Sequence, residues 1–267
     1  MASSVVTSRA NTRVKQLRAA FAGQARLSGG MVAIEGDHLL REALRSGMVF
    51  KTVFVSERLE LPGWVPYGVE VLRLADDVFR SVVETQSPRG LAALIVPPVP
   101  ELEDVLGTAS ESGRASLILI ACGLQDPGNL GTLVRSAEAF GATGVVTTPG
   151  TVSAWNQKAL RASVGSVFRM PVVAATVDEV AGLRARGIRL LAAVGEDEHG
   201  VKAAQEVDFV GACALMIGNE GQGLAEEWME IADARVTIPC PGPVESLNAG
   251  VAGSLLLYEA SRQRARQ

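Results

Sequence analysis

The chain has 267 residues, of which 48% are hydrophobic, 20% are charged and only 4% are aromatic. This composition excludes an intrinsically disordered chain and favours tightly packed α/β layers built from small and branched side chains. The formal net charge of −4 argues against a protein that binds nucleic acid over its whole surface, although a local basic patch is compatible with it.

The cysteines and histidines predict neither a disulfide framework nor a metal site. Cys122, Cys213 and Cys240 form no CxxC pair, and His38 and His199 lie outside any metal-ligand spacing. The N-terminus lacks the apolar segment of a signal peptide, and no apolar run reaches membrane-spanning length. We therefore expect a cytoplasmic protein in a reducing compartment, without a metal or a membrane partner.

Residues 1–98 alternate between helical and extended patterns, which predicts a small α/β domain. Helices are expected at 11–21, 38–45 and 76–83, and strands at 31–34, 49–55, 69–74 and 91–96. The first helix and its flanks are basic, so this face either contacts RNA or is simply solvated. The basic residues in question are Arg9, Arg13, Lys15 and Arg18.

A segment rich in Pro, Ser, Gly and acids follows at 99–114, and we interpret it as a domain linker with one short helix at 102–106. In residues 115–267, unbroken apolar strands alternate with helices, which predicts a parallel sheet covered on both faces. The expected strands are 117–121, 145–148, 171–174, 188–194, 212–217 and 236–238, and the expected helices are 130–140, 157–163, 177–185, 224–231 and 247–266.

The common phosphate-binding motifs are absent from the sequence. There is no G-x-x-x-x-G-K-[ST], and the glycines of 218–223 do not match G-x-G-x-x-G, which argues against a dinucleotide-dependent dehydrogenase. Three other segments follow strand ends, where the ligands of open α/β sheets bind.

In the first segment, Asn129 can cap the helix that follows the strand at 117–121. Gly128 and Gly131 share a helix face with Arg135. The small residues could leave room for a planar or anionic group beside the guanidinium. Alternatively, Arg135 pairs with Glu138 and the glycines allow close helix packing.

The other two segments are stiff or glycine-rich loops. The strand at 212–217 ends in a loop with three glycines at 218–223, which lets backbone groups come close to a ligand. The strand at 236–238 leads into a loop that three prolines stiffen. Ser246 is expected to cap the last helix, whose first turns consist of small residues and therefore predict close packing.

Together the three segments resemble the SpoU (TrmH) branch of the SPOUT methyltransferases. The resemblance covers 115–267, while 1–98 more loosely resembles an L30e-like RNA substrate-binding domain, through residues 33–43. The family motifs read N-x-G-x-x-x-R, a strand ending in G-x-E-x-x-G, and an I-P strand end followed by S-L-N. The matching residues are Asn129, Gly131, Arg135, Gly218, Glu220, Gly223, Ile238, Pro239, Ser246, Leu247 and Asn248.

This resemblance implies an RNA 2′-O-ribose methyltransferase that uses S-adenosylmethionine. It implies an α/β methyltransferase domain with a deep trefoil knot that holds the cofactor, and a homodimer with the active site near the subunit boundary. The apolar C-terminal helix, with its small face, is then a candidate dimer surface. The implied cofactor-binding residues are Thr147, Gly218, Asn219, Gly223, Ile238, Pro239, Ser246 and Leu247.

Arg135 is the residue that the resemblance places at the reaction. We expect it to hold an adjacent phosphate and stabilise the developing alkoxide, because a guanidinium stays protonated at physiological pH. The other implied catalytic residues are Asn129, Ser246 and Asn248, which would orient the ribose and Arg135, and Glu220, which would hold its loop or Arg135. Lys158 and Arg161 would add RNA contacts near the catalytic loop.

The resemblance leaves the RNA open. The L30e-like domain favours 23S-type rRNA, because it suits structured stems and loops. A tRNA methyltransferase, or an enzyme of this fold that methylates a base nitrogen, remains an alternative. A non-catalytic ribosome-assembly factor is a third possibility, against which Asn129, Arg135 and Ser246 argue because the residues for chemistry are present.

Overall fold

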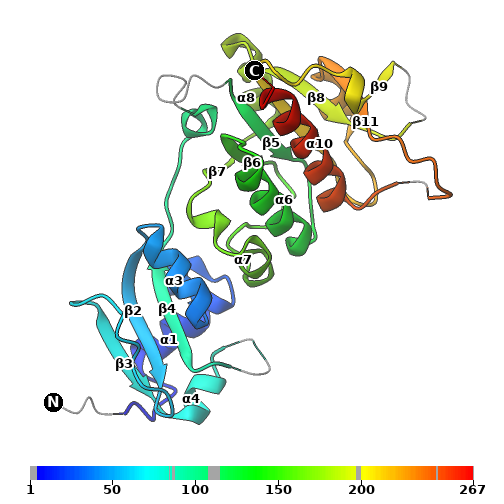
Figure 1. The fold of residues 1–267 in the computed structure, drawn as a ribbon. Helices are drawn as coiled ribbons and strands as arrows, with labels where there is room; N and C mark the ends of the chain where they lie inside the picture. The colour runs from blue at the N-terminus through cyan, green and yellow to red at the C-terminus, as the bar shows by residue number, and fades with distance from the viewer. Residues whose placement is uncertain are drawn as a thin grey trace. The chain divides into compact units, whose positions relative to one another are not determined.

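The computed structural model describes residues 5–83, 85, 88–107, 115–196, 200–244 and 246–266. His199 and residues 108–114 of the expected linker lie outside the described residues. The chain divides into two compact units, Met1–Pro98 and Val99–Gln267 (Figure 1). In the described part of the chain, no helix has the length and apolar character needed to cross a membrane.

The first unit is a small α/β domain, as predicted. Its sheet contains β1 (Val32–Glu35), β2 (Val49–Ser56), β3 (Glu70–Leu74) and β4 (Leu91–Val96), in the order β1-β4-β2-β3. Its helices are α1 (Thr12–Phe21), α2 (Ala25–Ser28), α3 (Asp37–Arg45) and α4 (Asp76–Arg80). The apolar stripe of α1 is buried in one cluster with Phe54 of β2 and Phe79 of α4, so burial of this stripe fixes α1 to the sheet.

The second unit is built on a seven-stranded sheet within the described residues, and its neighbouring strands are all parallel. The strands are β5 (Leu117–Ala121), β6 (Gly144–Thr147), β7 (Val172–Ala174), β8 (Arg189–Ala193), β9 (Val201–Ala203), β10 (Cys213–Ile217) and β11 (Ala234–Thr237). Their order is β7-β6-β5-β10-β8-β11-β9. Because parallel strands end at one edge, the loops after β5, β10, β8 and β11 emerge side by side.

Helices cover both faces of this sheet (Figure 1), as predicted. One face carries α6 (Pro127–Ala139) and α10 (Ala249–Arg264), with α7 (Gln157–Ser163) packed against α6. The other carries the 3₁₀ helices η1 (Leu102–Leu106) and η3 (Leu183–Arg186), with α8 (Val177–Gly182) and α9 (Glu226–Glu230). Two short 3₁₀ helices, η2 (Ser166–Phe168) and η4 (Ala204–Glu206), lie in connections. Successive residues of β10 point to opposite faces of the sheet. Met216 belongs to the buried cluster that contains Val105 and Trp228, whereas Ile217 lies beneath Gly253 of α10 on the other face.

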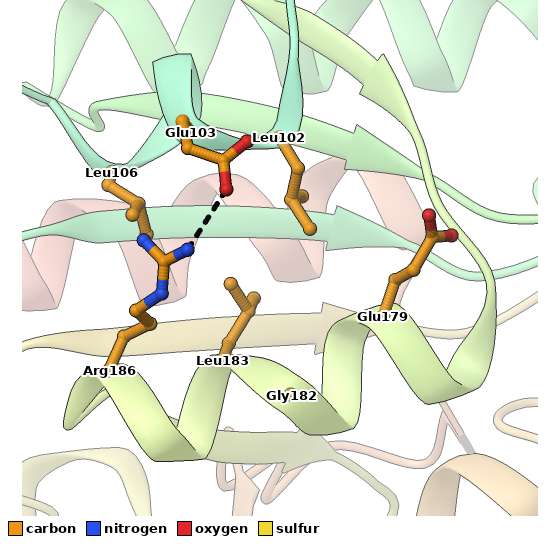
Figure 2. Close-up of a pocket in the computed structure, with 7 residues that line it drawn as sticks. All are labelled: Leu102, Glu103, Leu106, Glu179, Gly182, Leu183 and Arg186. Atoms are coloured by element: carbon orange, nitrogen blue, oxygen red, sulfur yellow. Dashed lines mark hydrogen bonds and ion pairs between the residues drawn. The ribbon is translucent and has the colours of Figure 1, made fainter.

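The short helix expected at 102–106 is present as η1, and it belongs to the second unit. Val105 is fully buried and lies so close to β6 that a Cβ on Gly144 would come within 2.5 Å of its Cβ. Figure 2 shows the seam between η1 and the α8–η3 segment, where Arg186 Nη2 lies 2.9 Å from Glu103 Oε1. A small pocket opens there, lined by Leu102, Glu103, Leu106, Glu179, Gly182, Leu183 and Arg186.

Two helix starts differ from the prediction. α6 begins at Pro127, with Asp126 and not Asn129 as its N-cap, because the Asp126 carboxylate accepts hydrogen bonds from the N–H groups of Gly128 and Asn129. Proline suits the first helical position because it has no N–H to lose. α10 begins after Asn248, which caps it in place of Ser246.

Two further elements of the second unit also differ from the prediction. α9 is shorter than the helix expected at 224–231. β9 is a strand where none was expected, since three residues carry no periodic signal.

Candidate functional site

The loops after β5, β6 and β10 are tied together at the carboxyl edge of the sheet. The N–H of Cys122 donates to the carbonyl of Ile217 (2.8 Å), which extends the pairing of β5 with β10. Gly123 then donates to Thr148 Oγ1 (3.1 Å) and accepts from Asn219 Nδ2 (2.8 Å). One glycine residue therefore links the three loops.

The glycine loop at 218–223 is a closed turn. Asn219 and Gly223 exchange two backbone hydrogen bonds of 2.9 Å, and Asn219 Oδ1 accepts from the N–H of Gly221 (2.8 Å). A Cβ on Gly218 would lie 2.3 Å from the carbonyl carbon of Gly223, so no larger residue fits without moving backbone. Gly223 also adopts a φ of +70°, in the left-handed region that favours glycine. The loop is therefore rigid before any ligand arrives.

The proline loop after β11 approaches the end of β8. Glu196, which follows β8, accepts a hydrogen bond on Oε1 from the N–H of Cys240. Ile238 and Leu247, at the two ends of this loop, are partly exposed. This loop emerges at the same edge of the sheet as the glycine loop, with β8 between β10 and β11.

A chain of hydrogen bonds connects the three motif segments. Asn129 Nδ2 donates to Glu220 Oε1 (2.8 Å), and Asn129 Oδ1 accepts from Asn248 Nδ2 (3.0 Å). Asn248 Oδ1 in turn accepts from the N–H of Val251 (3.2 Å) as the cap of α10. We call Glu220, Asn129 and Asn248 the amide relay. Its two side-chain hydrogen bonds connect residues that are separated by 91 and by 119 positions in the sequence.

Arg135 extends from α6 into solvent. Within the described residues it has no hydrogen bond or ion pair, and Glu138 pairs instead with Arg169, with 3.0 Å between Nη2 and Oε2. The Arg169 guanidinium lowers the pKa of the Glu138 carboxyl. The alternative in which Arg135 pairs with Glu138 is therefore wrong. The guanidinium is therefore available to a ligand.

The glycines of the first motif serve helix packing. A Cβ on Gly131 would lie 2.4 Å from the carbonyl oxygen of Ala159 and 2.7 Å from the Cβ of Ala162, both in α7. Gly131 therefore lets α7 approach α6, and α7 fills the space at this glycine, so the glycine itself opens no room for a ligand. Gly128 is also close to α7, since a Cβ there would lie 3.1 Å from Lys158 Cε.

The small face of α10 is used inside the chain. A Cβ on Gly253 would lie 2.4 Å from Leu133 Cδ2 of α6, and Ser254 Oγ lies 2.7 Å from Ser136 Oγ. Close packing on this face was expected, and α6 provides it. The small face is thus occupied within the chain, and the expected dimer surface on this helix would have to use its other faces.

Of the expected cofactor residues, most lie at this edge. Thr147 ends β6 and donates to the carbonyl of Val173 (3.3 Å), while Pro239 and Ser246 are exposed in the proline loop. Sequence reasoning missed Gly123, Thr148 and Glu196. Their one signal is that each follows a strand end by one to three residues.

The basic residues expected to contact RNA differ in their availability. Lys158 Nζ donates to Asp126 Oδ2 (2.8 Å) and thereby lowers the pKa of that carboxyl, whereas Arg161 is exposed and has no partner among the described residues.

In the first unit, acids from distant segments neutralise half of the basic patch. Arg13 Nε lies 2.8 Å from Glu70 Oε2, and Arg9 lies 3.7 Å from Asp77. Lys15 and Arg18 are exposed and unpaired within the described part.

The edge fits S-adenosylmethionine better than a phosphate-bearing cofactor. Glu196 and Glu220 bring carboxylates to the loops, and carboxylates favour a cationic sulfonium over an anion. The glycine loop offers close backbone approach, and Ile238 and Leu247 offer apolar surface to an adenine ring. The pocket in Figure 2 lies at η1 and α8, outside these loops.

A parallel α/β sheet with such an edge belongs to the class of open α/β folds that bind their ligand at the carboxyl ends of the strands. The model of the SpoU rRNA Methylase family matches residues 116–258, and that of the MRM3-like substrate binding domain matches residues 11–93. The chain belongs to the SpoU rRNA methylase family.

Its relatives include rRNA methyltransferases of known target. The chain is 34% identical to the 23S rRNA (guanosine(2553)-2′-O)-methyltransferase RlmP of Bacillus subtilis, over 95% of this chain and 97% of that protein. It is 31% identical to the 23S rRNA (uridine(2479)-2′-O)-methyltransferase of Streptomyces viridochromogenes, over 97% and 92%. The crystal structure of the SpoU methyltransferase AviRb from that organism, in complex with AdoMet, is similar with a TM-score of 0.82 at 29% identity, covering 96% of this chain and 98% of that one.

Proposed function

We propose that this chain transfers the methyl group of S-adenosylmethionine to a ribose 2′-hydroxyl of 23S rRNA. The observation that carries the proposal is the amide relay. Glu220, Asn129 and Asn248 come from the three motif segments and meet at one edge of the sheet, beside the rigid glycine loop. Full-length relatives that methylate 23S rRNA, and an AdoMet-bound structural neighbour, support the same reaction.

Three loops would hold the cofactor. When bound, S-adenosylmethionine supplies an activated sulfonium methyl group. Backbone groups of Gly218, Ile238 and Leu247 would hold its adenine and methionine parts, and the closed turn at 218–223 supports this because it is already formed without the cofactor. A rigid site saves the entropy that ordering a loop would cost.

Arg135 would act on the nucleophile. A ribose hydroxyl attacks only as its proton leaves, so the developing alkoxide needs a positive group beside it. Six residues along an α-helix correspond to about 9 Å, and helical side chains tilt toward the helix N-terminus, so the Arg135 side chain would reach back toward the end of α6 that carries Asn129. Arg135 would therefore stabilise the alkoxide while the relay and Ser246 orient the ribose. The proton would leave to water or to the adjacent phosphate.

The trefoil knot of the family is part of the proposal. β10 lies between β5 and β8, and β11 lies between β8 and β9, so later strands enter between earlier ones. Such an order supports a chain that passes through its own loop, which ordinary folds avoid.

We further propose that two copies of the chain pair through α10. Opposite its small face, α10 exposes Val251, Leu255 and Tyr258 by 47%, 43% and 52%, at the i, i+4 and i+7 spacing of one helix stripe. We call these residues the α10 stripe. The ring of Phe140 at the end of α6 extends it, with its centroid 5.7 Å from that of Tyr258. A contiguous apolar stripe on a helix next to Arg135 supports a dimer whose active site lies near the subunit boundary.

The decisive test is methyl transfer by an Arg135 variant. Arg135→Ala should lower the transfer of labelled methyl to an unmodified 23S rRNA transcript by roughly 100-fold or more, while the Kd for S-adenosylmethionine stays near wild type. Arg135→Lys should recover only part of the loss, because an ammonium lacks the planar fork of donors. Arg186→Ala, in the seam of Figure 2, is the matched control and should remain fully active.

The wild-type result separates the alternatives. Transfer to a tRNA pool but not to the rRNA transcript would move the substrate class to tRNA. Absence of transfer to either RNA, with cofactor bound, would favour an assembly factor and refute the proposed reaction.

A further inference from the structure

The segment between β2 and β3 places two aromatic rings at the surface of the first unit. The chain has only 2 Tyr and 3 Trp, and one of each lies here, at Tyr67 and Trp64. Tyr67 is fully exposed, with a relative accessibility of 107%, and Trp64 is partly exposed. Exposing a large aromatic ring forgoes the stabilisation that its burial would give, so this arrangement suits a ring with an external partner.

The segment is stiff. Two successive tight turns form it, with the N–H of Val65 donating to the carbonyl of Pro62 (3.1 Å) and that of Val69 to Pro66 (3.4 Å). Gly68, directly after Tyr67, adopts a φ of +86°. Prolines in both turns reduce the freedom of the backbone, so Tyr67 is held out at little entropic cost on binding.

Trp64 is anchored to α3 from two sides. Its indole N–H donates to Asp37 Oδ1 (3.1 Å), and the guanidinium carbon of Arg41 lies 4.9 Å from the ring centroid. Arg41 Nε donates to the other oxygen of Asp37 (2.7 Å). Arg41, and to a smaller extent Trp64, lower the pKa of the Asp37 carboxyl by these hydrogen bonds. The trio fixes the aromatic segment on the helix.

The charges around the rings distinguish stacking from phosphate binding. Arg41 is balanced by Asp37, Arg58 of the same segment pairs with Asp76, and Glu60 is exposed there. An RNA backbone would gain little from such a neutral to acidic surrounding, whereas an unpaired base needs only a ring or a guanidinium plane to stack on. The segment also lies within residues 11–93, which match a substrate binding domain.

We propose that the exposed ring of Tyr67 is a platform on which an unpaired base of the RNA substrate stacks, while Trp64 and Arg41 hold its segment against α3. The proposal rests on the proposed function for its occupant. It adds a contact in the first unit that recognises single-stranded bases without relying on charge.

The test compares RNA affinity across four proteins. Tyr67→Ala should weaken binding to an unmodified 23S rRNA transcript by roughly tenfold, as the loss of one stacked base does. Tyr67→Phe should bind like wild type, because the ring remains. Leu61→Ala, which removes an exposed apolar side chain from the same segment, is the control and should also bind like wild type.

Salt and kinetics make the test specific. Because stacking releases no counterions, Tyr67→Ala should leave the slope of log Kd against log salt unchanged, whereas Lys15→Ala with Arg18→Ala should reduce it. Tyr67→Ala should also raise KM for RNA without changing kcat or KM for S-adenosylmethionine. Equal affinity of wild type and Tyr67→Ala, or an equal loss in Leu61→Ala, would overturn the platform while methyl transfer by wild type continues. Absence of transfer by wild type would overturn the proposed function instead.

Discussion

The Asn129 side chain donates to Glu220 through its amide nitrogen and accepts from Asn248 through its amide oxygen. Substitutions that exchange donor and acceptor at this position can therefore test whether these hydrogen bonds matter for activity. Asn129→Asp places a carboxylate against Glu220 and should lower kcat for methyl transfer more than Asn129→Ala does. Adding Glu220→Gln supplies an amide donor opposite the introduced carboxylate and restores the hydrogen bond in reverse. The double variant should therefore recover activity relative to Asn129→Asp alone.

The relay is exposed to solvent, so these changes should affect the thermal midpoint little, because a solvated hydrogen bond contributes about 1 kcal/mol or less. Kinetics of the single and double variants, analysed as a cycle, check this. Purely additive losses would mean that the two side chains act independently and that the relay has no part in positioning.

At this scale the sequence predicted that certain residues lie together, but it did not predict which atoms they contact. Asn129, Glu220 and Asn248 were predicted to share a site, because each follows a strand end at a family motif. Their mutual hydrogen bonds depend on backbone positions that no local pattern specifies. The ion pairs of Arg13 with Glu70 and of Arg169 with Glu138 were missed for the same reason.

At the scale of elements, the contact between α6 and α7 depends on Gly131. Gly131→Ala should destabilise the second unit by roughly 1–3 kcal/mol, because the added methyl meets the backbone oxygen of Ala159, which a side-chain rotation cannot relieve. Gly182→Ala in α8 is the matched control, since nothing lies within 4 Å of its Cβ position. It should be neutral or stabilising by about 0.5–1 kcal/mol, as alanine favours a helix.

Urea unfolding of the two glycine variants, followed by circular dichroism, would measure both changes. A Gly131→Ala protein as stable as wild type would mean that α7 can move away from α6. Methyl transfer measured on the same proteins would then show whether this contact also positions Arg135.

The cores of elements were predictable and their ends were less so. Runs such as β5 and β4 were predicted to the residue, since an unbroken apolar run has no competing interpretation. Helix starts depended on competition between neighbouring caps. Asp126 caps α6 in place of Asn129, because its carboxylate accepts from the N–H groups of Gly128 and Asn129. Asn248 caps α10 in place of Ser246, because it bonds the N–H of Val251 and also the side chain of Asn129.

At the scale of the whole molecule, the parallel sheet was predictable and its strand order was not. The seven strands of the described residues are short and most are largely apolar, so their sequences do not indicate which strand lies beside which. The insertion of β10 between β5 and β8 brings the first and second motif loops together. With this strand order the loops after β5, β10 and β11 lie at one edge of the sheet. Only the resemblance to a known family predicted that these three loops form one site.

The last prediction concerns the formation of a dimer through the α10 stripe. Leu255→Glu places a charge in the centre of an apolar stripe that is 43% exposed at this residue in the single chain. If two stripes pack together, burying an unpaired carboxylate there costs several kcal/mol, and the dimer should dissociate at micromolar concentration. Sedimentation velocity of wild type and Leu255→Glu measures this directly.

Leu27→Glu is the matched control, because Leu27 is 67% exposed on α2 of the other unit, and it should sediment like wild type. The Leu255→Glu monomer should keep its fold by circular dichroism yet lose methyl transfer, since a site near the subunit boundary is incomplete in one copy. A wild-type protein that sediments as a monomer would remove the dimer from the proposal. A fully active Leu255→Glu monomer would place the complete site within one chain, and Arg135 would then act only on RNA bound to its own copy.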